Sequence, residues 1–220
     1  MQIRFECNLT GEEYVNQKAW CNASLPHCPL HPEGGCGLTR HGTYKRLSPS
    51  GTCIARWSCR RGQCTFSLLP DCLAARLPGT LAEVEEVVGV VEQARSLEAA
   101  CMGLRLQIEL PGVLRWVRRR VQAIYTSLNT LKGLMPERFA GCEPRLDAFA
   151  AHLGVDGVLS VLRQIAAPYL PSLPAPLGFS PLHRCGGEQD RSHQQSVGPD
   201  PLVLFAWCLV HSQSCVIRGG

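Results

Sequence analysis

The sequence lacks any long run of apolar residues. Its longest run, Leu202–Val210, has nine residues, which is about half the length of a membrane-spanning helix. The opening segment, Met1–Gln17, contains no apolar stretch of signal-peptide length. We therefore expect a cytoplasmic protein with no membrane partner.

Charge is also sparse. Charged residues make up 18% of the 220 residues, and the net charge of +4 is too small to mark the whole chain as a polyanion binder. The 45% share of hydrophobic residues can fill a core, which excludes a wholly disordered chain. Any nucleic-acid-binding signal must therefore be local.

Familiar catalytic motifs are missing as well. The sequence has no Gly-x-Ser-x-Gly elbow and no His-Glu-x-x-His pair. The glycine-rich stretch Gly34–Gly37 lacks the lysine and the following helix of a phosphate-binding loop. These absences predict a protein that is not an enzyme.

Cysteine, by contrast, is abundant. Eight of the thirteen cysteines lie between Cys7 and Cys72. Their odd number and the length of the chain argue against a disulfide scaffold, and in a reducing cytoplasm clustered cysteines more often hold metal. We expect one structural zinc ion, with His31 as an alternative ligand that could replace Cys36, and buried free thiols without metal as the other interpretation. The expected ligands are Cys28, Cys36, Cys59 and Cys64.

The arrangement of these cysteines is typical of a zinc ribbon. Two β-strands, Thr43–Leu47 and Cys53–Cys59, are expected to meet through the turn Ser48–Gly51. A tight zinc knuckle has two residues between its ligands. Here seven residues separate Cys28 from Cys36, and four separate Cys59 from Cys64, so the spacing predicts expanded loops.

Helical periodicity begins after the ribbon. Thr80 and Glu83 form a capping-box pattern that predicts a helix over Leu81–Ala94, and Ser96 can cap a second, short helix through Cys101. Pro111 and Gly112 open a third helix, and two packing helices are expected over Pro144–Leu153 and Asp156–Ala167. The apolar stripe of the third helix comprises Leu114, Val117, Val121, Ile124, Leu128 and Leu131.

The expected fold class is therefore α+β, with a small β zinc ribbon followed by an all-α helix-turn-helix bundle. From Pro168 to Pro181 five of fourteen residues are proline, which predicts an extended linker before an irregular, disordered tail. The expected parts are an N-terminal extension (1–27), the ribbon (28–72), the helix-turn-helix domain (78–134), the packing helices (142–167), and the linker with its tail (168–220).

Two stretches of the sequence are basic and contain no acidic residue. They are 34–70, in the ribbon, and 110–133, in the third helix. On that helix the polar face lies opposite the apolar stripe, where a helix in a DNA major groove carries its contacts. A solvated surface is the alternative interpretation of such charge. The expected DNA-binding residues are Arg40, Lys45, Arg46, Arg56, Arg60, Arg61, Arg115, Arg118, Arg119 and Gln122.

Parts of these stretches resemble a known family. The short helix at Ser96–Ala100, the turn, and the helix with Leu114-Arg115-Trp116-Val117-Arg118-Arg119 resemble the helix-turn-helix of bacterial insertion-sequence transposases. The segment Cys59–Pro70, with its Thr65-Phe66-Ser67, resembles the Cys-x-x-Cys-x-x-Thr-Phe-Ser signature in the N-terminal regions of those proteins and of a related uncharacterised family. Two features depart from that pattern: the wider second cysteine pair, and a long turn over Gly103–Leu110.

The resemblance implies double-stranded DNA as a partner, and with it an association with the nucleoid. Transposases of this kind carry a catalytic domain with three carboxylates and two metal ions, and the 89 residues after Leu131 leave no room for one. The expected function is DNA recognition by a transposase-associated protein without its catalytic domain, assisted by a separate catalytic subunit. The rival hypothesis is a zinc-stabilised interaction module in which the apolar stripe of the third helix is the seam of a homodimer.

Overall fold

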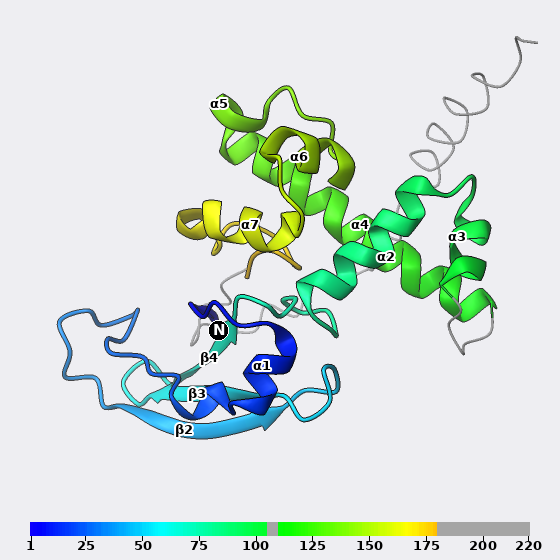
Figure 1. Cartoon of the computed structure of the whole chain (residues 1–220). Coiled ribbons are helices and arrows are strands. Elements are labelled where there is room, and N and C mark those ends of the chain that lie inside the picture. Colours follow the sequence, from blue (N-terminus) through cyan, green and yellow to red (C-terminus); the bar gives the residue numbers. More distant parts are fainter. Residues whose placement is uncertain (105–109, 180–220) are drawn as a thin grey trace, which may run out of the picture. The chain divides into compact units, whose positions relative to one another are not determined.

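The computed structural model describes residues 1–104 and 110–179, in which a four-stranded sheet precedes several helices (Figure 1). The α+β fold class is thereby confirmed at this level. The expected tail, with its apolar run Leu202–Val210, lies outside the described residues. The strands are β1 (Gln2–Phe5), β2 (Leu38–Lys45), β3 (Cys53–Cys59) and β4 (Cys64–Pro70).

The sheet has the strand order β1-β4-β3-β2. The neighbours β2, β3 and β4 pair antiparallel, as the ribbon hypothesis requires for its hairpin, whereas β1 pairs parallel with β4. The expected turn at Ser48–Gly51 joins β2 to β3, and Thr52 N–H closes it by donating to the Pro49 carbonyl. Strand β2 begins at Leu38, five residues before the strand that the sequence predicts.

Residues 1–27 are an integral part of this fold, although the sequence predicts an extension. They contain β1, helix α1 (Gly11–Asn16) and the short helix η1 (Ala19–Cys21). The Arg4 guanidinium binds the Asp71 carboxylate through two bonds of 2.8 and 3.0 Å. The fully buried Tyr14 donates to the Cys53 carbonyl at 3.0 Å. These long-range contacts bind the segment to β3 and to the residue after β4, and local sequence patterns do not reveal such contacts.

The helices follow the sequence patterns closely. Both expected caps are present: Thr80 and Glu83 form the capping box of α2, and the Ser96 hydroxyl accepts from the Ala99 amide at the start of α3. Gly154, in the left-handed conformation, ends α6. The helices are α2 (Leu81–Gln93), α3 (Leu97–Gly103), α4 (Leu110–Leu134), α5 (Pro136–Phe139), α6 (Leu146–Leu153), α7 (Val158–Ile165) and η2 (Ala167–Tyr169).

Two glutamates of α2 cap other helices. The Glu92 carboxylate accepts from the amides of Leu146 and Asp147 at the start of α6, at 2.9 and 3.1 Å. Seven residues earlier, Glu85 accepts from the first two amides of α7 at 2.8 and 2.9 Å. Neither α6 nor α7 has a side-chain cap at its own N-cap position. One helix face therefore supplies the anionic groups that both helix N-termini require.

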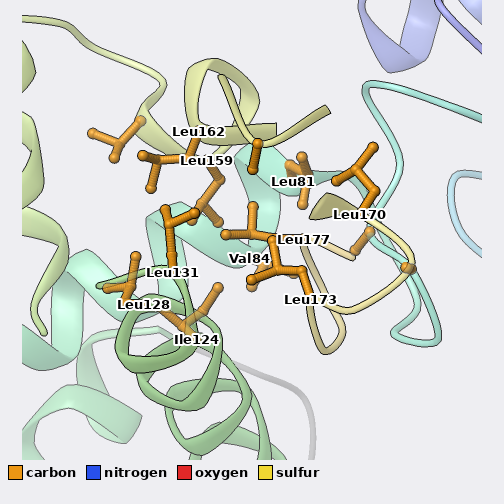
Figure 2. Packing of buried hydrophobic residues seen from close by; sticks show 14 of the residues in the cluster. Leu81, Val84, Ile124, Leu128, Leu131, Leu159, Leu162, Leu170, Leu173 and Leu177 are labelled. Carbon is orange, nitrogen blue, oxygen red and sulfur yellow. The ribbon is translucent and has the colours of Figure 1, made fainter. Parts of the chain in front are cut away.

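The proline-rich segment packs against the protein, which corrects the expected extended linker. Its leucines at 170, 173 and 177 are buried in the main core with residues of α2, α4 and α7 (Figure 2). Ser127 of α4 donates to the carbonyls of Pro174 and Ala175 at 3.1 and 3.0 Å. Proline excludes a continuous helix here, but buried leucines between the prolines supply the apolar surface that keeps the segment folded.

The side chain of Arg163 is fully buried where the end of β4 meets this segment. Its guanidinium donates to the carbonyls of Asp71 and Leu73 at 3.0 and 2.6 Å, and to that of Leu177 at 2.9 Å. Burial lowers the pKa of Arg163 to about 10, although the nearby Asp71 charge opposes this shift. The side chain remains charged at neutral pH and joins two segments that are remote in sequence.

Within the described part of the chain, no helix combines the length and the apolar character of a membrane span.

Replacing Arg163 with methionine should lower the free energy of unfolding by at least about 3 kcal/mol, because each buried carbonyl left without a donor costs about 1–3 kcal/mol. Urea unfolding followed by circular dichroism measures this loss. The matched control is Arg95→Met, at an exposed arginine, for which we expect a change within about 0.5 kcal/mol. Equal stability of the two variants would show that Arg163 does not hold these segments together.

Candidate metal centre

The centre starts from a tight turn between Cys28 and His31. The His31 amide donates to the Cys28 carbonyl at 3.1 Å, and the two residues form an isolated antiparallel bridge. Only Pro29 and Leu30 separate them, which is the two-residue spacing of a zinc knuckle. The two-residue spacing that the cysteine pairs lack is therefore present between this cysteine and this histidine.

Two further loops bring Cys36 and Cys59 to this turn. Gly34, Gly35 and Gly37 have φ values of +85°, +70° and +69°, and this left-handed backbone favours glycine. Cys59 ends β3, and the amide of Arg61, just beyond it, donates to the Cys36 carbonyl at 3.2 Å. The hydrogen bond holds the two loops together.

The four potential ligand atoms converge on one point. The sulfurs of Cys28, Cys36 and Cys59 and a ring nitrogen of His31 all lie within 4.8 Å of one another. His31 Nδ1 is 3.6 Å from Cys28 Sγ and 3.5 Å from Cys59 Sγ. Ligands at the usual zinc distances from sulfur and nitrogen would be about 3.6 Å apart at tetrahedral corners. These residues lie close enough to bind one metal ion, with Nδ1 as the nitrogen ligand.

The electrostatics of the group favour a bound cation. Burial opposes ionisation of Cys28, yet hydrogen bonds with His31, the Leu30 backbone and the neighbouring thiols lower the pKa of Cys28 to about 7. Burial, followed by interactions with Cys28 and Cys59, raises the pKa of Cys36. Three buried sulfurs cannot all ionise without a compensating charge, and a metal ion supplies one.

The structure places His31 beside Cys36, whereas the sequence offered them as alternatives. Cys64 is buried and lies opposite Cys59 in the β3–β4 register, but it is not a member of the converging group. Of the expected tetrathiolate, the structure therefore brings together three members, and His31 joins them as the fourth potential ligand.

Sequence patterns missed the part played by Gly62. Its amide donates to Cys59 Sγ at 3.2 Å, and such donors stabilise a thiolate next to a metal. A Cβ atom added at Gly62 would lie 2.9 Å from Leu30 Cδ1 and 3.2 Å from Cys59 Sγ. A side chain here would displace the end of Leu30 and crowd the Cys59 sulfur, so the position favours glycine. The signal in the sequence is a glycine three residues after a ligand cysteine.

The six basic residues of the ribbon fall into two groups. Arg40 donates to the carbonyls of Trp20 and Cys21, both at 2.7 Å, and Arg46 donates to those of Ala74 and Leu77. The half-buried Arg56 guanidinium lies 6.0 Å from the centre of the Tyr44 ring. These three arginines contact the protein itself. The other three side chains are exposed: Lys45, Arg60 and Arg61.

The expected DNA-binding residues of α4 are all exposed. Helix α4 also carries Arg120, which provides a contrast. Arg120 is buried, stacks 3.6 Å from the centre of the Trp116 ring and donates to the Pro78 carbonyl. Among the described residues, no side-chain hydrogen bond or ion pair involves three exposed arginines of this helix, Arg115, Arg118 and Arg119.

No protein-family model, no curated protein and no solved structure matches this chain.

Metal binding should depend on Cys59. We expect about one metal ion per wild-type chain and none in Cys59→Ser, because a buried ligand is lost, whereas Cys21→Ser should keep the metal. Cys21 is exposed and lies outside the ligand group. Elemental analysis of purified protein measures the ratio, and hydrogen exchange should rise over residues 28–37 when the metal is removed.

A second pair of variants tests the fourth ligand. His31→Ala should weaken metal binding at least about tenfold, and Cys64→Ser should weaken it less. Competition with a chromogenic chelator measures both affinities. The opposite order, with Cys64→Ser losing the metal and His31→Ala keeping it, would restore the tetrathiolate that the sequence favours.

Proposed function

We propose that the protein binds double-stranded DNA through the exposed face of α4, and that a structural zinc ion holds the ribbon in shape. Zinc is the proposed metal because three thiols and one imidazole at tetrahedral spacing are its usual structural ligands. A structural zinc ion has protein atoms at all four coordination positions. The four residues would therefore leave no position open for a substrate.

The observation that carries the proposal is the composition of one face of α4. Arg115, Arg118, Arg119 and Gln122 fall within an arc of about 100° at the usual helical rotation. All four are exposed, and the helix contains no acidic residue. A helix with basic and amide side chains along one face fits the major groove, where arginine pairs with guanine and glutamine with adenine.

The opposite side of α4 is anchored in the core. Val117 is buried together with residues of α2 and α3, and Ile124, Leu128 and Leu131 are buried with residues of α2, α6 and α7. A helix fixed in this way presents its outer face in one orientation, so little conformational entropy is lost on binding. The exposed ribbon residues Lys45, Arg60 and Arg61 would add contacts to phosphates.

The rival hypothesis, a homodimer seam along the apolar stripe of α4, has less support. The four stripe residues named above are buried within the chain's own core. A dimer through this stripe would have to displace that core.

The wider role that we propose is DNA recognition by a transposase-associated protein without a catalytic domain of its own. A separate catalytic subunit would then supply strand transfer. Several acids of the described residues already serve the fold: Glu85 and Glu92 cap helices, Asp71 binds Arg4, and Asp147 binds Arg145. These roles support recognition without phosphoryl transfer.

Replacing the three exposed arginines of α4 with glutamine should weaken duplex binding and lower its salt dependence. Each lost phosphate contact should reduce the slope of log K against log salt by about one. Fluorescence anisotropy with a labelled duplex at several KCl concentrations measures both quantities. An arginine that reads a base would instead cost about 1–3 kcal/mol on the preferred sequence only.

Arg138→Gln is the control, because Arg138 is exposed but lies on α5. It should leave affinity and slope unchanged. Absence of duplex binding by the wild type at low salt would refute the proposal, and so would a triple variant with the wild-type slope.

The chain should bind DNA without cutting it. Supercoiled plasmid carrying the preferred site, incubated with magnesium or manganese and the purified protein, should stay intact because two-metal cleavage needs converging carboxylates. Cleavage that disappeared on replacement of Glu137, Asp147 or Asp156 would identify an active site and contradict the proposal.

A further inference from the structure

The segments that follow β1 and β4 each carry a cysteine in matching positions. The last register pair of these parallel strands is Phe5 with Pro70, and Cys7 and Cys72 each lie two residues further on. After Pro70 the chain turns, and the Leu73 amide donates to the Pro70 carbonyl at 3.1 Å. The Arg4–Asp71 ion pair holds the two segments next to each other at this point.

The two thiols are neighbours. Interaction with the Cys72 thiol, and then with the backbone of Asp71 and Leu9, lowers the pKa of Cys7. Both cysteines are partly exposed, so a small reagent can reach them, and neither belongs to the metal-binding group.

The two thiols have shifted pKa values of opposite direction. The hydrogen bond with Cys72 is the main reason that the pKa of Cys7 is lowered to about 7, although burial opposes the shift. The same hydrogen bond, followed by burial, raises the pKa of Cys72. At neutral pH about half of Cys7 is therefore thiolate, the nucleophilic form, whereas Cys72 is protonated.

We propose that Cys7 and Cys72 are a reversible thiol–disulfide pair that reacts with low-molecular-weight disulfides. The Cys7 thiolate attacks one sulfur of the small disulfide, which breaks its S–S bond and releases one thiolate. The Cys72 thiol then loses its proton and attacks the mixed disulfide on Cys7, which releases the second small thiol. The two protein sulfurs are oxidised by two electrons, and the small disulfide is reduced to two thiols.

The consequence of oxidation is local. The new bond would link the residues that follow β1 to those that follow β4. The carbonyls of this second segment accept from Arg163. Such a cross-link between residues remote in sequence restricts the unfolded chain more than the folded one. Oxidised protein should therefore have a higher urea midpoint than reduced protein.

The test uses the full chain purified with zinc and treated with oxidised glutathione at neutral pH. After alkylation and proteolysis, mass spectrometry should identify a disulfide between the peptides of Cys7 and Cys72, which dithiothreitol removes. Iodoacetamide should modify Cys7 of the reduced protein at least about fivefold faster than the exposed Cys21. The Cys72→Ser variant should accumulate a glutathione adduct on Cys7, since the second step is blocked.

Cys21→Ser is the matched control and should form the Cys7–Cys72 disulfide like the wild type. Circular dichroism before treatment establishes that each variant is folded. The proposal fails if glutathione yields no Cys7–Cys72 peptide, if Cys7 reacts no faster than Cys21, or if the Cys72→Ser variant gains no adduct.

Discussion

The fold depends on one buried cation that binds backbone carbonyls. The guanidinium of Arg163, on α7, donates to carbonyls of the turn after β4 and of the proline-rich segment. A buried turn of this kind is normally unfavourable because its polar groups lose water. The guanidinium replaces that water with several directed donors, so the sheet can end, and the helical core can begin, in the protein interior.

Much of the helical part could be predicted from the sequence because its signals are local. The capping residues Thr80 and Ser96 and the terminating Gly154 act within one helical turn of their positions. The role of residues 1–27 and the packing of the proline-rich segment could not be predicted in this way. Both depend on partners far away in the chain, such as Asp71 for Arg4 and Pro174 for Ser127, and no local periodicity encodes them.

The metal centre, too, could be predicted from the sequence only in part. Cysteine spacing identified Cys28, Cys36 and Cys59, and the structure brings these three together. The choice between His31 and Cys64 depends on how the glycine-rich loop turns, which spacing alone does not specify. Among the basic residues, sequence composition could not separate Arg46, which binds carbonyls inside the protein, from the exposed Arg60. Burial makes that distinction, and burial is a property of the folded chain.

The capping of α6 and α7 by α2 has a consequence for how the chain can be divided. Because Glu85 and Glu92 supply the missing N-terminal caps, a fragment that begins after α2 would leave four backbone amides without their acceptors. The packing helices therefore do not form a separable module, despite their compact length and clear sequence boundaries. A minimal folding unit that contains α6 and α7 must also contain α2, and the carbonyls bound by Arg163 extend that requirement back to the end of β4.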